Sequence, residues 1–273
     1  MLTLLPTPIG NIEDITLRAL RVLEEADVIL CEDTRITKKL LHLLSERYDL
    51  KHNIKKFISL HSHNEFETIN SFDKNFFDQN VVYMSDAGMP CISDPGALLV
   101  QYCIENGIEY TVLPGPSAFT TAYAGSGFLD KEFLFFGFLP HKGKERQEKL
   151  QKVLNENYPV ILYESPHRLE KLLDELAQNI PDRVIVAAKE ITKKYEHYFK
   201  GTASQLKEQI IGALIKGEWV IIISPNKTNK QSSAITLKDI ESLDIPPKQK
   251  AKLLAKVTGK SVKECYLKLS AKS

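Results

Sequence analysis

Short apolar segments alternate with helix-like segments through most of the chain, and this alternation restricts the possible folds more than any other feature. Between the first two apolar segments, Leu17–Glu25 carries apolar residues on one helical face, and Asp14 and Thr16 are suited to cap its N-terminus. Strands that alternate with helices predict an α/β domain with a largely parallel sheet. The strands expected in the N-terminal part are Leu2–Pro6, Asp27–Glu32, Phe57–His61, Val81–Ser85 and Glu109–Pro114.

A second alternating set follows the Pro114-Gly115-Pro116 segment, which is typical of a chain reversal or hinge. Strands on both sides of "TKKY" (192–195) indicate an antiparallel ribbon within a mixed sheet, and helices are expected from Lys144, His167 and Ser204. We therefore expect α/β domains at residues 1–114 and 115–226. The strands expected in the second are Phe133–Pro140, Pro159–Ser165, Arg183–Ile191, Tyr195–Ala203 and Glu218–Ser224.

The C-terminal part is short and basic. A polar linker is expected at Pro225–Ser233, followed by a small helical domain (234–273) with helices at Lys248–Val257 and Val262–Leu269. Residues 227–273 contain eleven lysines and four acidic residues, a net charge of +7, so the remainder of the +1 chain carries −6. Such a tail indicates either a nucleic-acid contact or a helical unit with solvated lysines, and charge alone favours the second.

Several classes of protein and site are disfavoured. The four cysteines form no CxxC pair, and His61-x-His63 lacks further ligands, so we expect neither a metal site nor a disulfide framework. The N-terminus does not resemble a signal peptide, and no apolar run reaches about 18 residues, so we expect a soluble cytoplasmic protein without membrane contact. Neither the "GSG" at 125–127 nor the "GKS" at 259–261 completes a nucleotide-binding glycine motif.

Polar turns follow all five N-terminal strands, at the sheet edge where ligands bind in open α/β folds. These turns are "PTPIGN", "CEDTR", "HSHNE", "SDAGMP" and "PGPSA". Gly10, Gly88 and Gly115 would let the backbone approach a ligand closely, and Asp86 could accept hydrogen bonds from an amine or a ribose. The turns predict a binding site but do not identify its ligand.

Nine segments in order resemble the ribosomal RNA small-subunit methyltransferase I family, the RNA branch of the tetrapyrrole-methylase fold. They are "PTPIGNIEDIT", "CEDTR", "LHSHNE", "SDAGMPCISDPG", "LPGPSA", "GFLP", "YESPHRL", "KEITKKYE" and "GEWV". The resemblance runs from Leu2 to about Ser224, and the tail resembles the family's C-terminal helical unit. It implies two α/β domains with S-adenosylmethionine in the cleft between them, a homodimer, and methylation of a cytidine 2′-hydroxyl in the decoding region of 16S rRNA.

The same resemblance assigns cofactor-binding positions. One wall of the cleft would consist of Asp86, Ala87 and Gly88, with Ile92 and Ser93 after them. The remaining cofactor positions are Pro8, Gly10, Ser117, Ala118, Tyr163, Lys189 and Glu190. Met89 stands where the family often has Thr, which puts a hydroxyl contact there in doubt, and Lys189 stands where it often has Arg.

A ribose hydroxyl is a weak nucleophile until its proton is removed, so a general base is expected. The candidates are His61, Glu65, Asp33 and Glu164, although Asp33 with Arg35 and Glu164 with Arg168 could be structural ion pairs instead. Positions expected to contact RNA phosphates are Arg35, Lys38, Lys39, Lys248, Lys250, Lys252 and Lys260.

Two alternative functions remain open. One is a methyltransferase of the same fold acting on a tetrapyrrole or a protein side chain, although those branches usually carry G-x-G-x-G-D where this chain has "PTPIGN". The other is a non-catalytic RNA-binding relative, which the intact "SDAG" and "PGPSA" segments disfavour.

Overall fold

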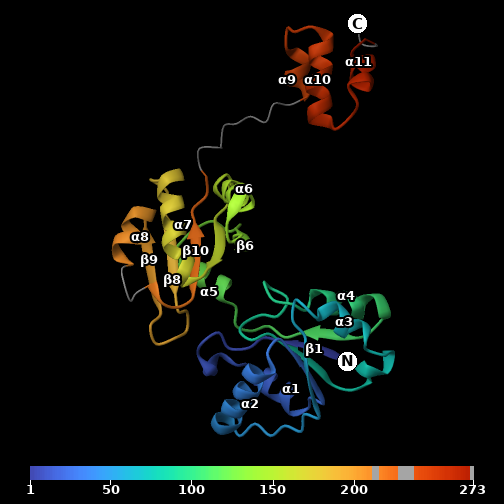
Figure 1. Ribbon diagram of the computed structural model, residues 1–273, viewed down its shortest axis with the longest axis vertical. Helices are drawn as coiled ribbons and strands as arrows, with labels where there is room; N and C mark the ends of the chain where they lie inside the picture. Colours follow the sequence, from blue (N-terminus) through green and yellow to red (C-terminus); the bar gives the residue numbers. More distant parts are fainter. Residues whose placement is uncertain (211–214, 227–236, 271–273) are drawn as a thin grey trace. The chain divides into compact units, whose positions relative to one another are not determined.

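The computed structural model describes residues 1–210, 215–226 and 237–270. The chain divides into two compact units, Met1–Pro225 and Asn226–Ser273 (Figure 1). Both sheets belong to the first unit. The expected division after residue 114 falls between these two sheets and inside that unit, so the separate domains at 1–114 and 115–226 stay a prediction.

The first sheet consists of five parallel strands in the order β3-β2-β4-β1-β5. The fold class expected from the alternating segments is therefore confirmed, and each strand is only one to three residues shorter than its expected range. Parallel pairing brings the carboxyl ends of all five strands to one edge of the sheet. The strands are β1 (Leu2–Leu5), β2 (Val28–Cys31), β3 (Lys56–Ser59), β4 (Val81–Met84) and β5 (Tyr110–Val112).

Helices cover both faces of this sheet, so its central strands are continuous apolar runs. Successive strand residues alternate between two cores: Leu5 and Met84 pack with α1 (Leu17–Glu24) and α2 (Thr34–Tyr48), whereas Leu4 and Tyr83 pack with α3 (Glu65–Asn70) and α4 (Ala97–Asn106). Thr16 caps α1 by accepting a hydrogen bond from the Ala19 N–H. Asp14 does not cap α1 but ends the 3₁₀ helix η1 (Ile12–Asp14), and a second 3₁₀ helix, η2, spans Lys74–Asp78.

The second sheet is mixed, with the order β6-β7-β10-β8-β9. Only the β6–β7 pair is parallel, and the expected ribbon is the antiparallel pair β8–β9. Helix α5 (Ala118–Gly125) packs on one face, and α6 (Gly143–Leu154), α7 (Pro166–Asn179) and α8 (Ala203–Gln209) pack on the other. The strands are β6 (Leu134–Phe138), β7 (Val160–Glu164), β8 (Ile185–Lys189), β9 (His197–Gly201) and β10 (Trp219–Ile223).

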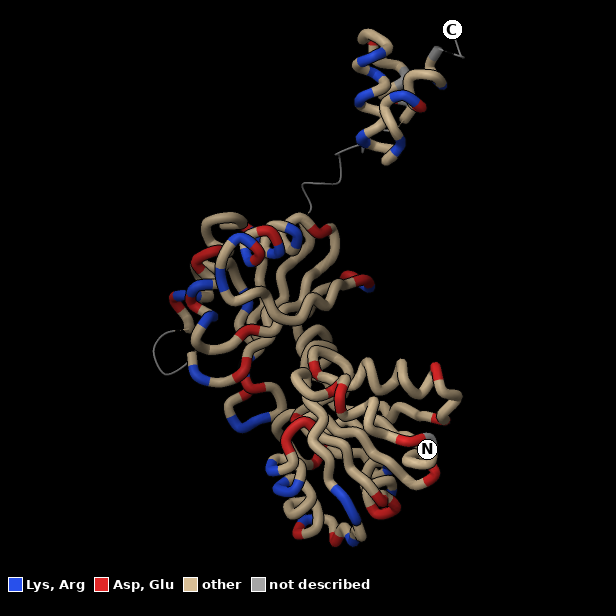
Figure 2. Tube along the Cα trace, turned by 45° about the vertical axis from the view of Figure 1, so that its right-hand side comes forward, with Lys and Arg blue, Asp and Glu red and all other residues tan. Residues whose placement is uncertain are grey.

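The second unit contains α9 (Leu237–Ser242), α10 (Pro247–Thr258) and α11 (Val262–Ser270) around a small core that includes Ile240, Ala251, Leu254 and Cys265. Helix α9 was not expected from the sequence, and most of the expected linker, residues 227–233, lies outside the described residues. Basic positions recur along the helices of this unit (Figure 2). In the described part of the chain, no helix combines the length and the apolar character needed to cross a membrane.

Candidate active site

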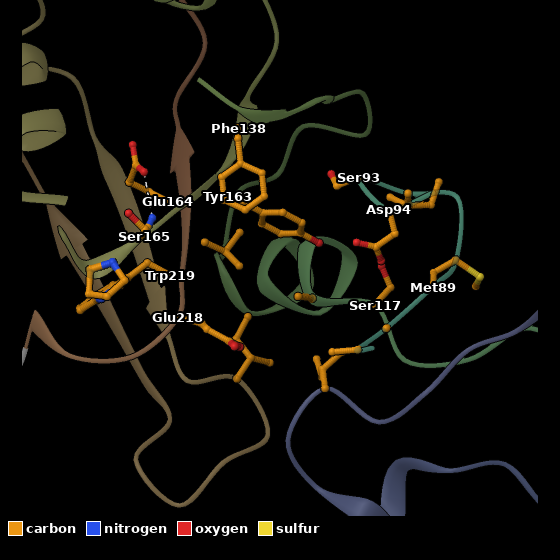
Figure 3. Close-up of a pocket in the computed structure, with 18 residues that line it drawn as sticks. Met89, Ser93, Asp94, Ser117, Phe138, Tyr163, Glu164, Ser165, Glu218 and Trp219 are labelled. Carbon is orange, nitrogen blue, oxygen red and sulfur yellow. Dashed lines mark hydrogen bonds between the residues drawn. The ribbon is translucent and has the colours of Figure 1, made fainter. Parts of the chain in front are cut away.

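A cavity of about 370 Å³ lies in the first unit, where loops from the first sheet meet strand ends of the second. One side comes from the loop after β1, the β4–α4 loop and the start of α5, and the other from β6, β7, Ile191 and β10 (Figure 3). The described residues that line it are Ile9, Ala87, Gly88, Met89, Ile92, Ser93, Asp94, Ser117, Ala118, Phe138, Tyr163, Glu164, Ser165, Pro166, Ile191, Glu218, Trp219 and Val220.

The β4–α4 loop contributes the first wall and has an unusual backbone. Cys91 and Ser93, neither of them glycine, both have φ of +67°, and Gly88 has φ of +90°. Reciprocal backbone hydrogen bonds of 3.0 Å between Thr7 and Gly88 fix this loop to the loop after β1. Left-handed backbone at non-glycine residues costs free energy and is enriched at ligand sites. The surrounding structure therefore holds Cys91 and Ser93 in a conformation that their own backbone preference disfavours.

Aromatic rings form the opposite wall. Tyr163 packs edge-on against Phe135 and Phe138, with ring centroids 5.1 and 5.5 Å apart. Phe138 remains half exposed, and the Arg168 guanidinium lies 6.0 Å from its ring centroid. Burial raises the pKa of Tyr163 to about 12, so its hydroxyl remains protonated and able to donate near neutral pH. This wall offers ring faces and one hydroxyl donor to a planar ligand.

Three carboxylates cluster behind and within the first wall: Glu32 after β2, and Asp86 and Asp94 after β4. Burial raises the pKa of each of them. For Asp94, burial and the charges of Glu32 and Asp86 raise the pKa to about 7. Asp86 accepts a hydrogen bond from the Asp33 N–H at 3.1 Å. Within the described residues, the Asp94 carboxylate has no hydrogen-bond donor and no cationic partner.

Three of the four candidate bases from the sequence do not line this cavity. Asp33 caps α2 and binds the Arg35 guanidinium, which lowers the pKa of Asp33 to about 2. Glu65 is buried and accepts a hydrogen bond from the Gly96 N–H at 2.8 Å. His61 follows β3, and its Nδ1 accepts a backbone hydrogen bond from two residues further on.

The fourth candidate, Glu164, belongs to a buried ion-pair network. Its carboxylate lies 2.7 Å from Arg168 and 3.8 Å from Arg146, and the Arg146 guanidinium also binds Glu175. Figure 3 shows the Glu164 carboxylate pointing away from the cavity, although its backbone is part of the wall. This position suits the structural ion pair considered as an alternative better than proton transfer.

The structure brings seven of the twelve expected cofactor residues to the cavity: Ala87, Gly88, Ile92, Ser93, Ser117, Ala118 and Tyr163. Pro8, Gly10, Asp86 and Glu190 do not line the cavity but each stands next to a lining residue in the sequence, whereas Lys189 does not. The contacts of Gly10, Lys189 and Glu190 are with other parts of the first unit.

Gly10 packs against the β8–β9 loop, where an added Cβ would lie 2.4 Å from the Lys193 Cγ. Glu190 accepts a hydrogen bond from the Glu218 N–H at 2.9 Å and pairs with Lys193 at 3.0 Å. Lys189 is buried, with its ammonium 5.7 Å from the Trp219 ring centroid.

Sequence reasoning did not name several lining residues, although it had quoted the segments that contain them. Asp94 comes from the "SDPG" turn, Phe138 from "GFLP", and Glu218, Trp219 and Val220 from "GEWV". These segments contained the available signal. The other missed positions are Ile9, Met89, Ser165, Pro166 and Ile191.

The expected RNA contacts fall in both units. Arg35, Lys38 and Lys39 are exposed on α2, although Arg35 is paired with Asp33 and Lys38 lies over Phe57. In the second unit, Lys248, Lys252 and Lys260 are exposed and Lys250 is half-buried. Within the described ranges, no group of three His, Cys, Asp or Glu residues is arranged to hold a metal ion.

Solved structures of similar fold are methyltransferases with low sequence identity to this chain. Uroporphyrin III C-methyltransferase from Thermus thermophilus is 16% identical, with a TM-score of 0.56 over 82% of this chain and 96% of that chain. A cobalt precorrin-4 methyltransferase is 18% identical, with a TM-score of 0.58 over 82% and 94% of the two chains. A further structure of the Thermus enzyme, with a TM-score of 0.55, is a complex with S-adenosylhomocysteine. These likenesses support the fold alone.

Sequence relatives are much more similar. The ribosomal RNA small subunit methyltransferase I of Campylobacter fetus is 48% identical over 98% of this chain and 99% of its own length. The protein of that name from Thermotoga maritima is 41% identical over 82% of this chain and 97% of its own length. Residues 1–207 match the family model of the tetrapyrrole (corrin/porphyrin) methylases. This chain therefore belongs to the ribosomal RNA small subunit methyltransferase I family, within the tetrapyrrole methylases.

Proposed function

We propose that this protein transfers the methyl group of S-adenosylmethionine to the 2′-hydroxyl of a cytidine ribose in the decoding region of 16S rRNA. Methylation of small-subunit rRNA follows from membership of the family. The identities of the methyl donor, the methylated atom and the nucleotide go beyond family membership and are proposed here. Such an enzyme works in the cytoplasm, where ribosomal subunits are found.

The observation that carries this proposal is the cavity itself. Its volume of about 370 Å³ suits a ligand of the size of S-adenosylmethionine. The aromatic wall around Tyr163 offers ring faces to an adenine. Because Gly88 has no Cβ, the backbone of its loop can approach a ligand closely. The hydroxyls of Ser93 and Ser117 suit an amino-acid or ribose group. The residues present therefore fit the cofactor.

The remaining predicted cofactor residues would act through their neighbours. Asp86 would raise the pKa of Asp94 through its charge and would accept a hydrogen bond from the Asp33 N–H. Pro8 and Gly10 would shape the loop that presents Ile9. Lys189 and Glu190 would fix Trp219 and the backbone of Glu218.

Bound S-adenosylmethionine supplies a methyl group on a positively charged sulfur, which is a good leaving group. The protein therefore has to align the ribose hydroxyl with that methyl group and exclude water. Cations on α2 and in the second unit would bind RNA phosphates, and we propose a homodimer as the assembled enzyme. The cations are Arg35, Lys38, Lys39, Lys248, Lys250, Lys252 and Lys260.

Two measurements test this function. Calorimetry should detect binding of S-adenosylmethionine to the full chain, and purified small subunits lacking the modification should receive labelled methyl on one cytidine ribose. Gly88→Val is the negative control. A Cβ at this position would lie 3.2 Å from the Ile9 side chain, and the backbone φ of +90° is unfavourable for valine. If the protein binds S-adenosylmethionine but does not label RNA, a tetrapyrrole or a protein side chain becomes the favoured substrate. If the protein binds small ribosomal subunits but not S-adenosylmethionine, the non-catalytic RNA-binding alternative is indicated.

A further inference from the structure

The acidic residues of the cavity differ in what their carboxylates contact. Three acidic residues occur among the described lining residues: Asp94, Glu164 and Glu218. Glu164 is buried against Arg168 and points away from the cavity. Glu218 pairs with Lys193 at 3.0 Å, and its side chain is 78% exposed. Asp94 is therefore the cavity carboxylate that no described cation neutralises.

The position of Asp94 is maintained by its loop. Ser93 before it has φ of +67°, and Gly96 after it has φ of +115°. The Gly96 N–H is held by Glu65, and the carbonyl of Pro95 accepts a 2.8 Å hydrogen bond from the Tyr83 hydroxyl. Figure 3 shows the Asp94 carboxylate directed into the cavity, toward the part that the Tyr163 ring also reaches. A loop with this backbone and these anchors presents the carboxylate in one defined direction.

We propose that Asp94 is the general base that accepts the proton of the ribose hydroxyl during methyl transfer. This inference rests on the proposed function. As the hydroxyl oxygen forms its bond to the methyl carbon, the hydroxyl proton passes to the Asp94 carboxylate. The bond between that carbon and sulfur breaks, and its electron pair stays on sulfur, which leaves neutral S-adenosylhomocysteine. Asp94 then returns the proton to water.

The surroundings of Asp94 match this role. A general base is most effective when its pKa is close to the working pH, and the pKa of Asp94 is raised to about 7. Burial is the main cause, followed by the charges of Glu32 and Asp86. The other titratable groups that interact with Asp94 are Cys91, Tyr83 and Tyr163. Burial and nearby acids raise the pKa values of Cys91, Tyr83 and Tyr163, so these three stay protonated while Asp94 titrates.

The test compares Asp94→Asn with Asp94→Glu in the full chain, using single-turnover methyl transfer to unmodified small subunits across pH 5.5–9. Glu105→Gln, which neutralises an exposed acid on the helix after the same loop, is the matched control. Wild type should gain rate as the pH rises through about 7. Asp94→Asn should be slower by about 100- to 10,000-fold and lack this rise, because one proton acceptor is removed. Asp94→Glu should retain the rise and part of the rate.

Calorimetry of S-adenosylmethionine binding supplies the readout that is independent of turnover. We expect Asp94→Asn to bind the cofactor with a Kd within about threefold of wild type, which would also establish that the variant is folded. An Asp94→Asn rate within threefold of wild type, or an unchanged pH profile, would refute the inference. Weak cofactor binding with a normal rate at saturation would refute it too, and would assign Asp94 to the cofactor. Wild type that binds cofactor without labelling RNA would overturn the proposed function and this inference together.

Discussion

The carboxylate of Glu65 accepts a hydrogen bond from the backbone N–H of Gly96 at a distance of 2.8 Å. Glu65 begins α3, and Gly96 precedes α4, so this bond joins two loops at the same edge of the first sheet. Gly96 cannot carry a side chain here, because a Cβ would lie 2.4 Å from the Tyr83 ring. A buried acid that would otherwise be a candidate base thus fixes one end of the loop that carries Asp94.

Removal of this acceptor should destabilise the protein. Glu65→Ala leaves the buried Gly96 N–H without a partner and should lower the free energy of unfolding by about 1–3 kcal/mol. Glu65→Gln keeps an acceptor oxygen and should cost less than about 1 kcal/mol. Urea denaturation at pH 7 measures both values. If both variants kept wild-type stability but lost methyl transfer, Glu65 would return as a candidate base.

Glu164 should also prove structural. Its buried carboxylate pairs with Arg168 and Arg146, so Glu164→Ala leaves buried charge uncompensated and should lower the free energy of unfolding by about 3–5 kcal/mol. Glu148→Ala, which breaks an exposed pair with Lys144, should cost less than about 1 kcal/mol. Denaturant unfolding gives the stability, and methyl transfer per folded molecule gives the activity. Lost transfer in a variant of normal stability would contradict the structural role.

The central strands of both sheets were predictable because they are buried, whereas the edge strands β3, β5, β6 and β9 are only partly buried. A strand covered on both faces reads as a continuous apolar run that ends at a polar or glycine turn, as Val81–Met84 does before Ser85. The strand order is not visible in such runs, because β4 lies between β1 and β2 through contacts distant in sequence. Helix α9 was missed because six residues are too few to display a helical period.

The sheet edge that carries the cavity was also predictable, whereas the direction of individual side chains was not. Lys189 lies on the same side of β8 as Ile185 and Ala187. Its side chain therefore points to the face of the sheet that α6, α7 and α8 cover, away from α5. Strand periodicity alone could have indicated this. The contact of Gly10 with Lys193 joins segments more than 180 residues apart, and no local pattern reports it.

The pKa of Asp94 also predicts how stability depends on pH. Because the folded-state pKa is about 7 and the ordinary value is 3.8, the folded protein binds more protons between these values. On account of Asp94, stability should therefore fall as the pH rises from about 4 to 7, and Asp94→Asn should remove that fall. At pH 8 the variant should melt about 2–4 °C above wild type, a modest gain because the carboxylate is partly solvated.

Asp33→Asn supplies the control with the opposite sign. Arg35 lowers the pKa of Asp33 to about 2, so its ionised form stabilises the folded protein above pH 4, and this contribution disappears as the pH falls toward 2. Asp33→Asn should therefore lower the Tm at pH 8, whereas Asp94→Asn raises it. Differential scanning calorimetry without cofactor measures both shifts. Equal Tm values for wild type and Asp94→Asn at pH 4 and pH 8 would contradict the raised pKa.

The lysines of the second unit give the last prediction. Lys248, Lys252 and Lys260 are exposed there, and replacing all three with Gln should weaken binding to small ribosomal subunits. Each lost phosphate contact should reduce the slope of log K against log salt by about 0.7–0.9, so the triple variant should lose roughly two units of slope or more. Lys144, Lys149 and Lys152 on α6 are also exposed and form the matched control when changed to Gln. Filter binding across salt concentrations measures the slope. Equal slopes in both triple variants would identify the C-terminal lysines as solvated surface, the reading that charge alone favoured.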